Sequence, residues 1–215
     1  MNNTRTGLLL LLLPFFLSCC HIYEPMILPM ANYYYLNPDE DLSTVGRVAI
    51  VELDNDSTYP QISTDITDAL FQALQKKQLF GLTVIRQDDP LWRSLQLDAD
   101  STYTLEQLST IRKTLKYDAV LTGTVTRYQP YPHMTVGLRL KLVDLRDGQL
   151  LWALEQIWDS ADKTTEYRIK SFFRSQMRSG FEPLGERLTI LSPLKFTKFV
   201  AYEVAETLRV KKIGL

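Results

Sequence analysis

The chain has 215 residues, of which 45% are hydrophobic and 23% are charged, and its formal net charge is −1 at pH 7. This composition is typical of a folded protein and excludes a largely disordered chain. The near balance of 24 basic and 25 acidic residues gives no electrostatic support for nucleic-acid binding. Without an N-terminal leader, about 195 residues remain, which is enough for one domain with a hydrophobic core.

The first twenty residues have the pattern of a bacterial signal peptide. Arg5 precedes an uninterrupted apolar run from Gly7 to Leu17. As a helix this run would span about 16 Å, which is much less than the hydrocarbon core of a bilayer at about 30 Å. We therefore predict a cleaved signal peptide over residues 1–18, and neither a transmembrane helix nor a buried N-terminal helix.

Both cysteines of the chain, Cys19 and Cys20, directly follow the apolar run. The segment Phe16–Cys19 resembles a bacterial lipobox, in which apolar residues and a small residue precede the cysteine whose thiol accepts diacylglycerol. We predict acylation at Cys19. Cys20 is the second choice, because the residue before it is a cysteine. The alternative is a signal peptide that happens to end in two cysteines. The folded part then has no cysteine and no disulfide bond.

The lipobox resemblance also implies a location. The residue after the acceptor is Cys20 or His21, and neither is the aspartate that marks retention in the inner membrane. The implied protein is a lipoprotein that carries palmitate, is anchored in the cell outer membrane and faces the periplasm. Acyl chains hold a protein on a membrane because each buried methylene contributes about 0.8 kcal/mol.

Residues 19–45 are predicted to form a lipidated tether between the anchor and the domain. Pro25, Pro29 and Pro38 interrupt this stretch, and neither a helical nor a strand period holds in it. The aromatic run Tyr33–Tyr35 could dock on the domain, contact a partner or lie among lipid headgroups, and docking is the simplest of the three.

Residues 46–215 are predicted to form one periplasmic α/β (α+β) domain, which begins with parallel β-α-β units. The apolar runs Arg47–Leu53 and Leu82–Ile85 suit buried strands. Ser63 is expected to cap the helix between them. The apolar residues of that helix have the spacing of one buried face: they are Ile66, Ala69, Leu70, Ala73 and Leu74.

Two more helices are expected before the sheet continues. The first is a short helix over residues 90–97. The second begins after Thr104, which can form a capping-box pair with Gln107. Its inward-facing residues are Leu105, Leu108, Ile111 and Leu115.

After these helices, the spacing of apolar residues changes to the two-residue period of strands. Residues 118–128 form a predicted strand in which Gly123 marks a bulge or a close approach. From Met134 to Leu142 apolar residues alternate with polar or small ones, which predicts a long strand with one buried face. Asp147–Gly148 predicts a tight hairpin turn, and the return strand runs from Leu150 to Trp158.

Two helices, over residues 164–177 and 193–208, close the chain. The first is amphipathic and could rest on anionic lipid headgroups or on a partner. Packing of its aromatic face on the sheet is the simpler interpretation. Its basic residues are Arg168, Lys170, Arg174 and Arg178, and its apolar ones are Tyr167, Phe172, Phe173 and Met177. A single mixed sheet, parallel first and then an antiparallel meander, with helices packed on it, explains the whole order most simply.

Four segments together resemble a known group of proteins. They are the strand Val48–Leu53, the strand Leu82–Ile85 with Arg86 after it, the strand Tyr117–Val125 and the hairpin Val143–Trp152. They resemble a superfamily of bacterial envelope lipoproteins that includes the curli secretion-channel subunit and the lipoprotein activators of penicillin-binding proteins. The implied fold is similar to the N-terminal domain of the periplasmic Tol-system protein. The resemblance covers about residues 46–160. The chain lacks a pair of long alternating segments that would form the membrane hairpins of a curli-type channel.

The sequence predicts no catalytic, cofactor-binding or metal-binding residue. The two histidines are His21 in the tether and His133, which is expected at an exposed strand end, and they are too few for a triad or a His-rich metal site. Paired carboxylates could cleave glycosidic bonds, but the acidic pairs lie in predicted loops, where aspartate stabilises turns. These pairs are Asp54 and Asp56, Asp88 and Asp89, and Asp98 and Asp100.

We therefore expect a non-catalytic outer-membrane lipoprotein that acts as a binding or assembly factor for another envelope protein or complex. One alternative is a subunit of an oligomeric envelope secretion complex, which includes a homo-oligomer. The other is a cell-wall hydrolase that uses the loop aspartates. Trp152 is expected to be a core residue rather than a binding platform.

Overall fold

The structure is a computed structural model of the chain that describes residues 33–90, 93, 104–176 and 192–208. One mixed sheet of seven strands runs through these residues in the order β1-β7-β6-β5-β2-β4, and β3 pairs with β5. The strands are β1 (Tyr34–Leu36), β2 (Arg47–Val51), β3 (Asp54–Asn55), β4 (Gly81–Ile85), β5 (Ala119–Gln129), β6 (Thr135–Asp144) and β7 (Leu150–Asp159). The helices are α1 (Ile62–Lys77), α3 (Leu105–Leu115), α4 (Lys163–Gln176) and α6 (Pro193–Thr207), with a 3-10 turn at Leu42–Thr44.

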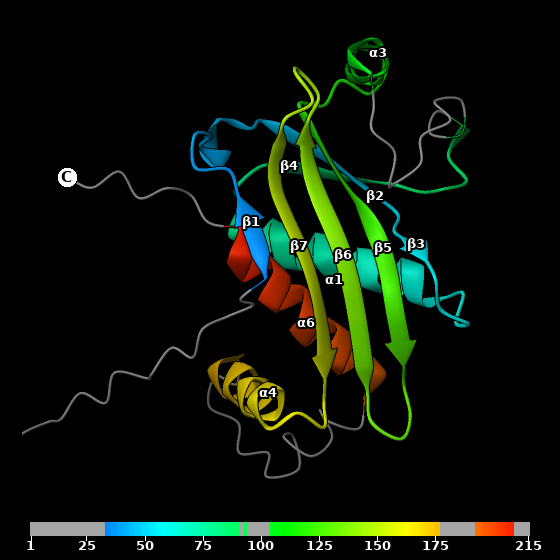
Figure 1. The fold of residues 1–215 in the computed structure, drawn as a ribbon, viewed down its shortest axis with the longest axis vertical. Coiled ribbons are helices and arrows are strands. Elements are labelled where there is room, and N and C mark those ends of the chain that lie inside the picture. The colour runs from blue at the N-terminus through cyan, green and yellow to red at the C-terminus, as the bar shows by residue number, and fades with distance from the viewer. Residues whose placement is uncertain (1–32, 91–92, 94–103, 177–191, 209–215) are drawn as a thin grey trace, which may run out of the picture.

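This architecture confirms the predicted fold class. β2 lies between β4 and β5 and is parallel to both, while β5, β6 and β7 form an antiparallel meander. α1 and α6 lie across one face of the sheet, as Figure 1 shows behind the strands. The predicted hairpin turn is present, and Gly148 has a φ of +79°, a conformation that glycine adopts without strain. None of the helices in the described ranges has the length and apolar content needed to cross a bilayer.

The main core lies between the sheet and the pair α1 and α6. It takes the inward residues of β2, β5, β6 and β7 together with both helices. Trp152 is fully buried there, and its indole Nε1 donates a hydrogen bond of 3.1 Å to the Thr207 hydroxyl. The tryptophan is therefore a core residue, as predicted. A second, smaller core lies on the opposite face, where Leu108 and Ile111 of α3 pack on residues of β2, β4 and β5.

Gly123 lies in the middle of β5, opposite Leu140 of β6. A Cβ atom at this position would overlap the backbone oxygen of Arg139 and lie 2.9 Å from the Cα of Leu140. The predicted close approach is therefore present. The bulge lies elsewhere, between Val125 and Arg127.

The structure differs from two predictions about local structure. The stretch before the domain, for which the sequence shows no strand period, contains β1, and Leu42 and Val45 after it are buried in the main core. Ser63 is not the cap of α1. The helix begins at Ile62, and the Ser63 hydroxyl donates instead to the backbone oxygen of Leu53. The hydroxyl thus ties the first turn of α1 to the segment between β2 and β3.

The other predicted helices agree with the structure where it describes them. Thr104 and Gln107 form the capping box of α3, and α4 and α6 match the last two predicted helices within two residues. Ser192 occupies the N-cap position of α6 without a side-chain hydrogen bond to the helix. The short helix expected over residues 90–97 lies mostly outside the described residues, as do the side chain of Leu105 and residues Met177 and Arg178.

A buried ion pair fastens α4 to α6. Nη1 of Arg168 lies 2.9 Å from Oε2 of Glu203, and only 12% and 5% of the two side chains are exposed. Burial raises the pKa of the Glu203 carboxyl, and the nearby Arg168 opposes this rise. In the same interface between α4 and α6, the Phe172 ring packs against Phe199 and Tyr202 of α6. The aromatic face of α4 therefore contacts α6 through Phe172, and both Phe172 and Phe173 pack against the main core.

Replacing Gly123 with alanine tests the close approach between β5 and β6. We expect Gly123→Ala to lower the free energy of unfolding by about 1–3 kcal/mol or more, because two backbone segments have to move apart. The matched control is Gly81→Ala in β4, where the new Cβ meets no atom closer than 3.6 Å. Denaturant unfolding measures both variants, and equal stability of the two would contradict the close approach.

The ion pair of α4 gives a second prediction. Arg168→Met leaves the Glu203 carboxylate buried without its cation and should cost about 3–5 kcal/mol near neutral pH. Because the folded-state pKa of Glu203 is raised, the carboxyl becomes neutral in acid and the loss should shrink as the pH falls. Lys170→Met removes an exposed pair with Glu166 and should change stability by about 0.5 kcal/mol or less. A loss that does not depend on pH would disprove the role of Glu203.

Candidate binding surface

The two faces of the sheet are covered unequally. α1 and α6 cover one face, whereas α3 covers only the end of the other (Figure 1). Over β1, β7, β6 and the middle of β5 no described helix packs on this second face. We call it the open face. Its side chains are set by the two-residue period of strands, because each residue that points into the main core is followed by one that points away.

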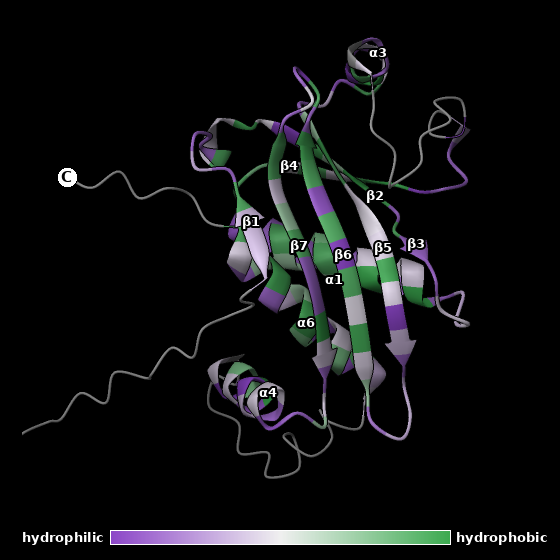
Figure 2. Cartoon of the chain, in the orientation of Figure 1, coloured by the Kyte–Doolittle hydropathy of each residue, from purple (hydrophilic) through white to green (hydrophobic). Residues whose placement is uncertain are grey.

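Along β6 the core residues Leu138, Leu140 and Leu142 alternate with Gly137, Arg139 and Lys141. Figure 2 shows the resulting alternation of hydrophobic and hydrophilic residues along the strand. On β7 the open-face residues are Ala153, Glu155 and Ile157, which lie opposite Lys141, Arg139 and Gly137. The prediction of a long strand with one buried face is therefore confirmed, and the other face of that strand contributes to a surface.

β1 extends the open face by one strand. Its backbone pairs antiparallel with β7, with Tyr35 opposite Ala153, and the Tyr33 oxygen accepts a hydrogen bond of 3.3 Å from the Glu155 nitrogen. The Asn37 nitrogen adds a bond of 2.9 Å to the Leu151 oxygen. Docking of the tyrosine run on the domain is thus confirmed for its backbone. The rings of Tyr33 and Tyr35 remain 73% and 45% exposed.

A shallow groove of about 540 Å³ crosses this face. Its floor is the backbone row of Gly123, Leu140, Leu154 and Tyr34, and the side chains of the last three belong to the other face. Tyr33, Glu155 and Arg139 form one wall, and Tyr35, Ala153 and Lys141 form the other. The groove therefore runs across the strands, between two transverse ladders of side chains.

The groove combines aromatic rings with charges. Nη2 of Arg139 lies 3.1 Å from Oε1 of Glu155, and both side chains are about half exposed or more, so the pair contributes little to folding. Beside it, Ile157 is 56% exposed over Gly137, which has no side chain to cover it. Tyrosine, arginine and exposed aliphatic residues are the types enriched where proteins bind other proteins.

The acidic pairs differ in their placement, and Asp54 lies in a strand and not in the predicted loop. Asp54 is in β3 and accepts a hydrogen bond of 3.0 Å from the Gln87 side chain, and Asp56 follows it. Both line a polar groove of about 530 Å³, in which Asp88 and Asp89 take no part. The Asp89 nitrogen donates to the Arg86 oxygen in the turn after β4. Asp98 and Asp100 lie outside the described residues.

His133 is exposed at the start of β6, and its Nε2 lies 3.8 Å from Oδ2 of Asp159. Among the residues that the structure describes, no three His, Cys, Asp or Glu side chains gather into a possible metal site. The predicted lipidation residues Cys19 and Cys20 lie outside the described residues, as does His21.

Comparison with protein-family models and with curated proteins finds no match. Several solved structures have a similar fold. A PelC dodecamer from Paraburkholderia phytofirmans is 15% identical, covers 83% of this chain and 96% of its own, and has a TM-score of 0.48. Lipoprotein GNA1162 from Neisseria meningitidis is 19% identical, with 61% and 97% covered and a TM-score of 0.43. The C-terminal domain of LpoB from Escherichia coli is 22% identical, with 53% and 83% covered and a TM-score of 0.37.

One of these solved structures, GNA1162, is named as a lipoprotein. The identities of the three structures to this chain are at most 22% and their TM-scores are below 0.5. At such distances one fold carries many different sites, so no residue role is transferred from them to the open face.

Proposed function

We propose that this protein is an outer-membrane lipoprotein without catalytic activity, which binds another cell-envelope protein through the open face of its sheet. Residues 1–18 are the signal peptide, and Cys19 carries the lipid. Residues 19–45 join the anchor to the domain of residues 46–215, and the end of this linker lies on the sheet as β1. The anchor holds the domain at the periplasmic side of the membrane, where an envelope partner can meet the open face.

The observation that supports binding is the groove across the open face. It spans four strands about 4.8 Å apart, a width of about 14 Å, which matches about four residues of extended chain. Tyr33 and Tyr35 provide aromatic surface for apolar side chains of the partner. Arg139 and Lys141 outnumber Glu155 among the charges of the groove, so a partner segment with apolar and acidic side chains fits it best.

The anchor is tested by metabolic labelling with an alkyne fatty acid, followed by separation of the inner and outer membranes. The wild-type chain should be labelled and should sediment with the outer membrane. Cys20→Ala should keep the label and the membrane location. The double variant Cys19→Ala/Cys20→Ala should lose both, and it replaces Cys19→Ala alone because that change would place a small residue directly before Cys20. Loss of label already in Cys20→Ala would move the acceptor by one residue. A wild-type chain without label would disprove the lipoprotein proposal.

The open face is tested by crosslinking in intact cells from a photoreactive amino acid placed at single positions. Position 157, exposed on β7, should give a discrete adduct with an envelope protein. The control is position 75, which is exposed on α1 at the opposite face of the sheet and should give none. The double variant Tyr35→Ser/Ile157→Ser, which changes exposed side chains, should fold and lose the partner. Adducts at position 75 and none at 157 would place the interface on the helical side.

A further inference from the structure

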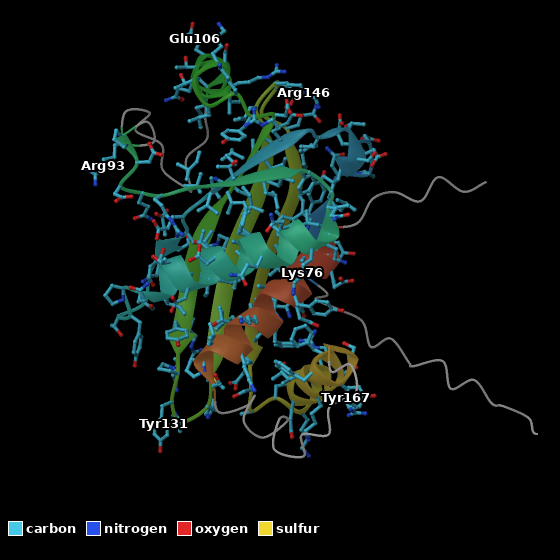
Figure 3. The ribbon with its side chains drawn as sticks, turned by 180° about the vertical axis from the view of Figure 1, so that it is seen from behind. Lys76, Arg93, Glu106, Tyr131, Arg146 and Tyr167 are labelled. Atoms are coloured by element: carbon cyan, nitrogen blue, oxygen red, sulfur yellow. The ribbon has the colours of Figure 1, made fainter. Side chains whose placement is uncertain are left out.

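A second concave site lies on the opposite side of the molecule, where three helices meet. It is a cleft of about 430 Å³ between α1, α6 and α4, a volume within the range of small-molecule sites. We call it the helical cleft. Figure 3 shows this side of the molecule, with α1 and α6 across the sheet, α4 beside α6 and Lys76 on α1.

Small residues on two facing helices create the space. Ala69 and Ala73 lie one turn apart on α1, and Ala205 faces them from α6. The third side is aromatic: Phe172 and Phe173 of α4 pack edge to face, with their ring centroids 4.7 Å apart, and the Tyr202 ring lies 4.6 Å from Phe172. The inside of the cleft is therefore mainly apolar.

The lining carries more positive than negative charge. It contains Lys76, Lys77 and Lys198 and a single acidic residue, Glu206. Lys77 forms an ion pair with Glu206 that joins α1 to α6. Lys76 and Lys198 are exposed, one on each helix, and no described carboxylate forms an ion pair with either. After internal pairing, two cations remain beside an apolar cleft.

We propose that the helical cleft binds a linear fatty-acid anion, with its acyl chain along Ala73 and the two phenylalanines and its carboxylate paired with an exposed lysine of the lining, Lys76 or Lys198. The apolar lining suits a hydrocarbon chain, and the excess of lysine suits an anionic head over a neutral or cationic one. The volume suits one acyl chain of small-molecule size. The site is separate from the open face and does not depend on the function proposed for that face.

The proposal is tested on the full chain in isolated membranes with a hexadecanoic acid that carries a photoreactive diazirine. After illumination, the adducts should map to α1, α4 or α6. Unlabelled hexadecanoate should compete, and hexadecyltrimethylammonium at the same concentration should not.

Two kinds of variant give matched comparisons. Ala73→Phe fills the cleft and should reduce labelling at least about fivefold. Lys76→Ser/Lys198→Ser changes only exposed side chains and should do the same, while Lys113→Ser/Lys163→Ser removes equal charge elsewhere and should label like the wild type. If Ala73→Phe does not fold, the comparison of the two double lysine variants still tests the proposal. Adducts outside the three helices, equal competition by the cation, or equal labelling of both lysine pairs would overturn the proposal.

Discussion

The close pairing of β5 with β6 is the contact on which the rest of the structure depends. β5 is parallel to β2 and β3 on one edge and antiparallel to β6 on the other, so it joins the β-α-β half of the sheet to the meander. The two backbones approach so closely at Gly123 that no other residue fits without movement. Because β6 in turn aligns β7 and β1, the register set at Gly123 also positions the rows of the open face.

The coverage of this sheet explains where the two surfaces arise. α1 and α6 cover one face, and a cleft lies where alanines of both helices face α4. On the other face, α3 reaches only one end, so the strands that follow β5 keep one side in solvent. Antiparallel sheets tolerate such one-sided burial, whereas parallel strands are usually covered on both sides. The exposed rings of Tyr33 and Tyr35 and the side chain of Ile157 then lie on the uncovered part.

Elements with a strong periodic pattern of apolar residues are predicted well from the sequence, whereas elements with only weak local patterns are predicted poorly. The alternation from Met134 to Leu142 correctly predicts a strand with one solvent-facing side, and the turn at Gly148 correctly predicts the hairpin. β1 is not predicted, because three consecutive tyrosines show no alternation of apolar and polar residues. The strand forms by pairing with β7, which lies far along the chain. The helical cleft is not predicted from the sequence either. Ala69 and Ala73 have the spacing of buried residues, and only the packing of α4 shows that space remains beside them.

The central claim is that a partner covers the open face in the cell envelope. Oxidative footprinting of the full chain in native envelopes and after purification tests it directly, with the tyrosines and Ile157 as internal probes. Tyr35 and Ile157 should be protected in the envelope and modified after purification, whereas Tyr131, 83% exposed at the hairpin between β5 and β6, should be modified equally in both. Equal modification of Tyr35 and Ile157 in the two samples would contradict the account.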